Sequence, residues 1–195
     1  MTYEVIGISG KAGCGKDYIF QNYLQTRGFL QISLSWHFKV DLIAKGVITF
    51  EEAFKTKPPN VRTLLQLVGT ELGRTVYGEK IWCDTLRAWM DVYNFHWGTT
   101  RFAIPDVRFL SELDFIQNDL KGNVIRILAP IRTGGTTLDS TQRAHVSEAE
   151  MDKIVNNNFD GLIYNDPGVH DLDLQLEVLF KEFGYEYSEI QTVHT

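Results

Sequence analysis

One short segment near the N-terminus constrains the fold of this chain more than any other. It is Gly10-Lys11-Ala12-Gly13-Cys14-Gly15-Lys16-Asp17, which has the spacing G-x-x-x-x-G-K. An apolar, β-branched run at 3–9 precedes it, and a helical pattern over about 16–25 follows it. Glycines let backbone N–H groups curl around phosphate oxygens, and the following helix points its positive end at the same anion. The segment predicts a phosphate-binding loop in which Lys16 reaches the β- and γ-phosphates of a nucleotide. A plain glycine-rich turn is the alternative.

Asp17 stands where this motif usually carries Ser or Thr. A hydroxyl at that position normally binds Mg²⁺. A carboxylate is also a hard oxygen donor, so Asp17 could hold the ion directly or through water. The alternative is that Asp17 only stabilises the helix start, where the helix dipole favours an acidic side chain.

Apolar runs alternate with helical patterns along the rest of the chain. We expect strands at 3–9, 29–33, 101–106, 123–129 and 161–165. We expect helices at 16–25, 36–45, 59–73, 80–95, 109–121, 147–155 and 170–183, a Gly- and Thr-rich loop at 130–146, and a tail or edge strand at 185–195. This order predicts an α/β fold, with a parallel five-stranded sheet flanked on both faces by helices in right-handed crossovers.

The composition fits one such domain and limits its partners. The chain has 195 residues with no internal repeat or linker, so a single domain over 1–195 is expected. Its formal net charge of −6 argues against a nucleic-acid polymer as partner. There is no N-terminal signal pattern and no apolar run near 18 residues, so a cytoplasmic protein without a membrane span is expected. Cys14 and Cys83 lack metal-ligand spacing and are expected as free thiols.

Asp106 and Arg108 follow the third expected strand, at the edge where open α/β sheets bind ligands. Asp106 could hold Mg²⁺ through water or orient an acceptor oxygen, and Arg108 could clamp a phosphate with two hydrogen bonds. A surface ion pair of little consequence is the alternative.

A helical segment at 61–74 carries a second polar cluster. Arg62, Gln66 and Thr70 lie on one helical face, and Arg74 follows Gly73. Such a face suits a phosphate and a base edge, and an ordinary solvated face is equally consistent with it.

Arg132 and Arg143 flank or lie within the loop at 130–146. A mobile lid of this kind can bring an arginine over a transferring phosphoryl group, and two solvated arginines are the alternative. Beyond Arg143, His145 and Ser147 precede a helix. Ser147 is interpreted as a helix N-cap with Glu150, because no G-x-S-x-G elbow supports a nucleophile there.

The motifs separate two classes of nucleotide-binding protein. A regulatory GTPase would carry a guanine-reading N-K-x-D and a D-x-x-G switch following a strand, and neither is present in that context. A small-molecule kinase needs a second anion site and a cationic lid, and candidates for both are present.

In these segments the chain resembles the bacteriophage deoxynucleoside monophosphate kinases. The matching segments are GKAGCGKD at 10–17, FK at 38–39, VRTLLQLVGTELGR at 61–74, KIW at 80–82, IPDVRFLSE at 104–112, HVSE at 145–148 and LIYND at 162–166. The block R-x-x-x-Q-x-x-G-T together with PD-x-R is more specific than the loop alone. The resemblance implies a P-loop kinase fold with an acceptor-binding helical region at about 34–98 and a lid at about 130–147.

The resemblance also implies an activity: transfer of the γ-phosphoryl group of ATP, with Mg²⁺, to a deoxynucleoside 5′-monophosphate. For a phage-encoded enzyme the compartment is the host cytoplasm. The implied ATP-binding residues are Gly10, Lys11, Ala12, Gly13, Cys14, Gly15, Lys16 and Asp17, with Asn165 and Asp166 near the adenine. The implied substrate-binding residues are Lys39, Arg62, Gln66, Thr70, Arg74 and Trp82. The implied catalytic residues are Lys16, Asp106, Arg108, Arg132 and Arg143, with Asp17 and Asp106 toward the metal.

Two features depart from the family. Ala129-Pro130 replaces the Arg-Pro that often follows the fourth strand, so Arg132 or Arg143 would take over its role, and LIYNDPGVHDLD at 162–173 replaces a simpler N-D-G loop. Three alternative functions remain open: a dephospho-CoA kinase, a kinase of a hydroxymethylated base in DNA, and a nucleotide-binding interaction module without turnover.

The accepted base and the assembly are the least constrained features. Candidate aromatic residues for the base are Trp36, Phe38, Tyr77 and Trp82, which at these spacings are more often core residues. If copies of the chain associate, a homodimer is the expectation, because dimers are the commonest closed assembly.

Overall fold

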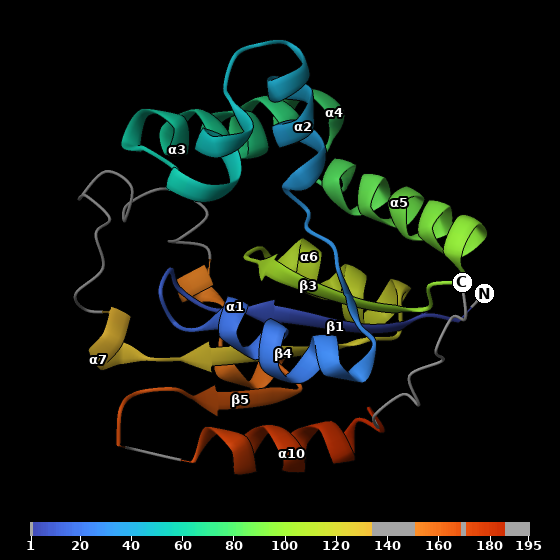
Figure 1. Cartoon of the computed structure of the whole chain (residues 1–195), viewed down its shortest axis with the longest axis vertical. Coiled ribbons are helices and arrows are strands. Elements are labelled where there is room, and N and C mark those ends of the chain that lie inside the picture. Colours follow the sequence, from blue (N-terminus) through green and yellow to red (C-terminus); the bar gives the residue numbers. More distant parts are fainter. Residues whose placement is uncertain (1, 134–150, 169–170, 186–195) are drawn as a thin grey trace, which may run out of the picture.

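A parallel five-stranded sheet forms the centre of the computed structural model, which describes residues 2–133, 151–168 and 171–185 (Figure 1). The strands are β1 (Glu4–Ser9), β2 (Leu30–Gln31), β3 (Arg101–Val107), β4 (Asn123–Leu128) and β5 (Gly161–Tyr164). Their spatial order is β2-β3-β1-β4-β5, and every neighbouring pair is parallel. All five expected strands are therefore present, and the expected fold class is confirmed.

The two faces of the sheet are buried by different sets of helices, as the alternation of side chains along each strand requires. Val5 of β1 faces the core under α5 (Ile81–Trp97), α6 (Leu110–Asp114) and η5 (Phe115–Asp119), whereas its neighbour Ile6 faces the other core. That second core lies under α1 (Lys16–Ile19), its continuations η1 (Phe20–Leu24) and η2 (Gln25–Arg27), and α10 (Leu172–Glu182). Both faces of β1 are covered, which explains its continuous apolar sequence.

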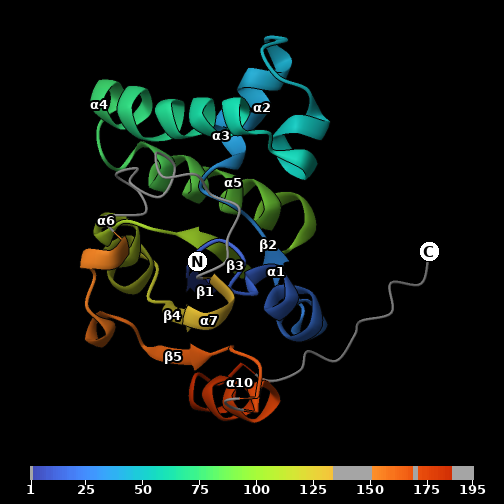
Figure 2. The same ribbon diagram turned by 90° about the vertical axis from the view of Figure 1, so that its left-hand side faces the viewer.

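A group of helices between β2 and β3 packs at one end of the molecule, opposite α10 (Figures 1 and 2). It contains α2 (Trp36–Ala44), η3 (Glu51–Thr56), α3 (Pro59–Gln66), η4 (Leu67–Leu72) and α4 (Gly73–Tyr77). These helices have a small apolar core of their own around Leu42, Ile48, Ala53 and Val61. They lie within residues 34–98, the range over which an acceptor-binding helical region is expected.

The helix at Glu51–Thr56 was not expected from the sequence. Its start is fixed by a reciprocal arrangement: the Thr49 backbone N–H and hydroxyl donate to the Glu52 carboxylate, and the Glu52 backbone N–H donates back to the Thr49 hydroxyl. This is a capping box, and Thr49-x-x-Glu52 was the sequence signal for it.

The expectation of a loop from residue 130 is wrong for its first residues. Pro130–Thr133 form a short helix, α7, with proline at its start, and the Asp166 carboxylate accepts hydrogen bonds from the backbone N–H groups of Ile131 and Arg132. This cap comes from the loop after β5, so local sequence gave no sign of it. The rest of the expected loop and lid lies outside the described residues, as does the tail at 186–195.

The remaining helices agree with expectation within a few residues. Of the helix expected at 147–155, only residues 151–155 are described, and 151–153 are helical. The helix expected at 59–73 continues through α4 to Tyr77. Within the described part of the chain, no helix is both long and apolar enough to cross a membrane.

Candidate active site

The loop at residues 10–17 joins the carboxyl end of β1 to the N-terminus of α1, as the sequence predicts. Gly13 and Gly15 have φ of 81° and 102°, which other residues rarely adopt. The Lys16 ammonium donates to the carbonyl oxygens of Gly10 at 2.6 Å and Lys11 at 2.9 Å. The lysine is thus held across the loop, where a nucleotide's phosphates would replace part of its hydrogen bonding.

Gly10 and Cys14 close the base of the loop. A Cβ at Gly10 would lie 2.6 Å from the Cys14 Sγ and 3.0 Å from the carbonyl oxygen of Ile127, so only glycine fits. Cys14 and Cys83 are both buried free thiols, as expected. Burial raises the pKa of the Cys14 thiol despite the nearby Lys16 ammonium, so Cys14 packs as a neutral group.

The loop after β5 directly contacts the loop at residues 10–17, which we call the phosphate loop. The Asn165 amide donates to the carbonyl oxygen of Cys14 at 2.8 Å, and a Cβ at Gly15 would lie 2.3 Å from the Asn165 nitrogen. The same hypothetical Cβ lies 3.8 Å from a guanidinium nitrogen of Arg132, whose helix is capped by Asp166. Asn165 and Arg132, expected at the ATP site or lid, therefore lie beside Gly15, and Asp166 stands at the start of α7.

Opposite the phosphate loop lies a cationic wall, and the two enclose a cavity of about 610 Å³. On the loop side the lining residues include Ala12, Gly13, Lys16 and Asp17. On the opposite side they include Lys39, Arg62, Gln66, Thr70, Arg74 and Trp82, whereas Asp106 and Arg108 line the cavity from the end of β3, the strand beside β1. The structure thus brings all six expected substrate-binding residues, from α2, α3, η4, α4 and α5, into one space with the phosphate loop and the end of β3.

Asp106 fixes the entrance to the helical region. Its carboxylate accepts hydrogen bonds from the Ser33 hydroxyl at 2.6 Å and from the backbone N–H groups of Leu34 and Ser35, both at 3.1 Å. It therefore ties the end of β3 to the turn between β2 and α2.

Lys39 lies on α2 in the cavity wall, its ammonium 5.2 Å from the centre of the Phe54 ring. Burial lowers the pKa of Lys39 to about 8, with the Asp106 carboxylate opposing this and the charges of Lys57 and Arg108 adding to it. A second anion bound here would favour the charged form of the lysine.

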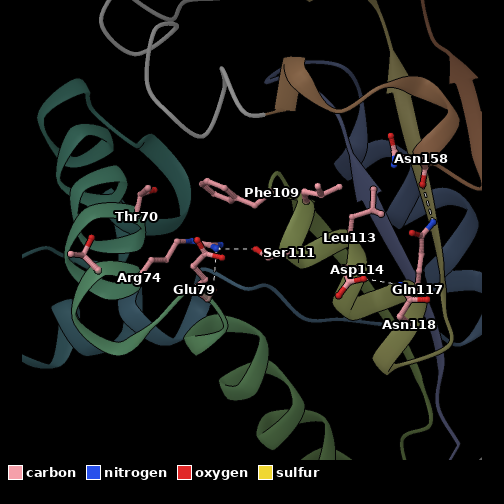
Figure 3. A pocket seen from close by; sticks show the side chains of 12 residues that line it. Thr70, Arg74, Glu79, Phe109, Ser111, Leu113, Asp114, Gln117, Asn118 and Asn158 are labelled. Carbon is pink, nitrogen blue, oxygen red and sulfur yellow. Dashed lines mark hydrogen bonds between the residues drawn. The ribbon is translucent and has the colours of Figure 1, made fainter.

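Arg74 forms a buried ion pair with Glu112, the third residue of α6. Its guanidinium also donates to the carbonyl oxygen of Glu79 at 3.1 Å and to the Ser111 hydroxyl at 3.4 Å, and it lies 3.9 Å from the centre of the Phe109 ring (Figure 3). Arg74, which is expected to face a monophosphate, thus lines the cavity while its guanidinium is held by protein groups.

Trp82 has a packing role that the sequence did not reveal. Its indole N–H donates to the carbonyl oxygen of Gly69 at 2.6 Å, and its ring lies 5.0 Å from that of Phe38. A Cβ at Gly73 would lie 2.1 Å from the Trp82 ring. The tryptophan is 7% exposed, so it joins α5 to η4 and α4 and presents little surface to a ligand.

Two other expected residues either do not line the cavity or lie outside the described residues. Lys11 is half-exposed and pairs with Asp152 at 3.0 Å. Arg143 lies outside the described residues. Sequence reasoning missed Lys57, which lines the cavity with a φ of 45°, and Glu112. Glu112 ends the matching segment at 104–112, but no role was expected for it, and no motif marked Lys57.

The residues present fit a magnesium nucleotide. Mg²⁺ in phosphotransfer sites is usually held by one or two carboxylates together with the phosphates, and Asp17 and Asp106 line the same cavity. The described residues contain no cluster of three or more His, Cys, Asp or Glu that could hold a metal by themselves.

Comparison with known proteins shows a shared fold. No protein-family model and no curated protein matches the sequence. The chain is similar to the solved structure of TT1252 from Thermus thermophilus, with a TM-score of 0.54 and 17% identity over 93% of this chain and 98% of that one. A sugar kinase from Janibacter sp. has a TM-score of 0.49 and 12% identity over 92% of this chain and 93% of that one. A dephospho-CoA kinase from Campylobacter jejuni has a TM-score of 0.49 and 16% identity over 91% of this chain and 96% of that one.

Proposed function

We propose that this chain transfers the γ-phosphoryl group of ATP to deoxynucleoside 5′-monophosphates, giving ADP and the diphosphates. One observation carries the proposal: the phosphate loop and a separate cationic wall, with Lys39, Arg62 and Arg74, face each other across a single cavity of about 610 Å³, and Arg108 lines it from the end of β3. One anion needs only one such surface. Two facing surfaces suit a donor and an acceptor that meet end to end.

On the donor side, the residues at 10–17 bind the ATP phosphates. The positive-φ glycines expose backbone N–H groups to the phosphates, and Lys16 supplies a charge at the β- and γ-phosphates. Asn165 and Arg132 lie beside Gly15 and complete this side near the nucleotide. Asp17 and Asp106 would hold Mg²⁺, which neutralises charge on the phosphates when bound.

On the acceptor side, Arg62 and Lys39 bind the 5′-phosphate and Gln66 meets the base or sugar. The resemblance of the segments at 61–74 and 104–112 to the phage kinases supports a deoxynucleoside monophosphate as the acceptor. An acceptor phosphate oxygen attacks the γ-phosphorus in line while the bond to the β,γ-bridging oxygen breaks, and ADP leaves. Arg108, with Arg132 or Arg143, stabilises the charge on the transferring group.

The proposal is tested by measuring ADP release with dAMP, dGMP, dCMP, dTMP and dephospho-CoA as separate acceptors. We expect turnover that depends on at least one deoxynucleoside monophosphate. Lys16→Ala should reduce it by roughly a thousandfold, the scale of losing a charge at the reacting phosphates. Lys45→Ala is a matched control, because Lys45 is exposed and pairs with Asp41 on α2.

Three results would overturn the proposal. They are turnover with dephospho-CoA alone, ATP binding without turnover on any acceptor, and full activity in Lys16→Ala.

A further inference from the structure

Glu112 occupies an unusual position, because one buried carboxylate serves three elements. Its side chain is 3% exposed and lies on α6, whose start follows the end of β3. One carboxylate oxygen accepts the backbone N–H groups of Arg108 at 2.7 Å and Phe109 at 3.1 Å. The other accepts the guanidinium of Arg74 from α4, 38 residues earlier in the chain.

An ordinary helix cap explains only part of this arrangement. A glutamate at the third helical position commonly accepts the backbone N–H at the helix start, which here is that of Phe109. Capping does not require the additional bond to Arg108 or the buried pair with Arg74. Burial raises the pKa of Glu112 to about 7 against the opposing effect of Arg74, so holding this carboxylate in the core is costly.

The two arginines that Glu112 touches both line the cavity that the phosphate loop also lines. Glu112 fixes Arg108 through its backbone and Arg74 through its guanidinium, which is also stacked on Phe109. The Arg74 Nε is buried and has no hydrogen-bond partner among the described residues. The other two guanidinium nitrogens are hydrogen-bonded to the protein, so the group is held in one orientation.

We propose that Glu112 is a positioning residue of the acceptor site, holding Arg74 and Arg108 in the orientation in which both face the acceptor's phosphate. This inference rests on the proposed function. Long arginine side chains lose rotamer freedom when they bind an anion. A fixed carboxylate that already holds them restricts their rotamers in the empty site, so less conformational entropy is lost when the anion binds. Glu112 also links the helical region to the sheet at the point where the two nucleotides would meet.

The test is Glu112→Gln. The glutamine amide nitrogen is a donor, so it faces either the Arg74 guanidinium or the Arg108 and Phe109 N–H groups without accepting from them. We expect kcat/KM for the acceptor to fall about tenfold or more, the scale of a lost charge-assisted hydrogen bond, while KM for ATP changes less than about twofold. Glu112→Asp, which keeps the charge, should recover part of the loss.

A double-mutant cycle separates positioning from stability. If Glu112 acts through Arg108, adding Glu112→Gln to Arg108→Ala should cost less than about threefold beyond Arg108→Ala alone. Glu177→Gln is the matched control, because Glu177 pairs with the buried Arg27 at 2.6 Å on the opposite face of the sheet. It should lower thermal stability and leave both KM values unchanged.

A binding measurement keeps this inference distinct from the proposed function. Inorganic phosphate is titrated into protein saturated with Mg-ADP, which leaves the cationic wall for the added anion. We expect Glu112→Gln to weaken phosphate binding about fivefold or more, whether or not any monophosphate is turned over. Unchanged phosphate affinity, fully multiplicative losses in the cycle, or an equal loss in Glu177→Gln would overturn the inference. Absence of turnover in the unmodified chain would instead overturn the proposed function.

Discussion

The ammonium of Lys39 lies where burial opposes its charge, and this makes the acceptor side sensitive to pH. Its pKa is lowered to about 8, so in the empty cavity Lys39 loses its proton as pH rises through that value. A bound phosphate favours the protonated form. Acceptor affinity should therefore be highest below about pH 8 and should decline above it.

We predict that KM for the acceptor rises about tenfold between about pH 7.5 and pH 9.5 in the unmodified chain. In Lys39→Arg the guanidinium stays charged over this range, so the rise should be largely absent. Steady-state kinetics at saturating ATP across this pH range measures KM for the acceptor in both proteins. The same pH slope in the two proteins would show that Lys39 does not carry the acceptor's charge.

Lys57 lines the cavity in a left-handed conformation, with φ of 45°, just before the prolines that begin α3. Asparagine tolerates this conformation better than lysine. We predict that Lys57→Asn leaves the melting temperature unchanged or raises it, while KM for the acceptor rises about threefold through the lost charge.

Lys121 provides the control for this prediction, because its φ is 56° and it does not line the cavity. Lys121→Asn should have the same effect on melting temperature and none on KM. If both variants leave KM unchanged, Lys57 has no part in acceptor binding.

Individual site residues were predictable from sequence where a motif fixed their backbone, and less so where a distant partner decides their role. Lys16 and Asp106 lie where the strand ends place them. The sequence indicated Arg74 but not Glu112, because the pair joins two helices 38 residues apart. Trp82 was expected at the substrate, and its burial against Gly69 and Gly73 depends on how α5 packs on η4 and α4.

At the scale of elements, the packing of α5 against α4 depends on the absence of a side chain at Gly73. A Cβ there would lie 2.1 Å from the Trp82 ring, which is buried and hydrogen-bonded to Gly69 and so has little freedom to move. We predict that Gly73→Ala lowers the free energy of unfolding by about 1–2 kcal/mol, because overpacking outweighs the gain in helix propensity.

The comparison variants localise this effect. At Gly69 a Cβ would lie 3.0 Å from the end of the Phe38 ring, a milder contact, so Gly69→Ala should cost less. Adding Trp82→Phe to Gly73→Ala should cost less than the sum of the two changes, because the smaller ring removes the clash. Thermal or urea unfolding of the three single variants, the double variant and the unmodified chain gives the free energy of unfolding of each. Additive costs would mean that Gly73 and Trp82 do not constrain each other.

The elements themselves followed from sequence where hydrophobic periodicity was strong. All five strands were predictable because each is a short apolar run ending near glycine or polar residues. The helix at Glu51–Thr56 was missed because its apolar pattern is weak, although Thr49 and Glu52 marked its start. Helix α7 was missed because its cap, Asp166, comes from another strand end.

At the scale of the whole molecule, the site is built at the carboxyl edge of one sheet. The phosphate loop follows β1, Arg108 follows β3, α7 follows β4 and Asn165 follows β5. Parallel strands bring these segments together, and the helices inserted between β2 and β3 add the facing cationic wall. A chain with net charge −6 thereby gathers several cationic side chains around one cavity, which is what the proposed function requires.

The most direct test of this account is a crystal structure of the chain with Mg-ADP and the deoxynucleoside monophosphate that it phosphorylates best. The account predicts ADP phosphates within the loop at 10–17 and the acceptor's phosphate within hydrogen-bond distance of Arg62 and Arg108, in the same cavity. A monophosphate bound outside that cavity, or one whose phosphate contacts neither arginine, would contradict the account.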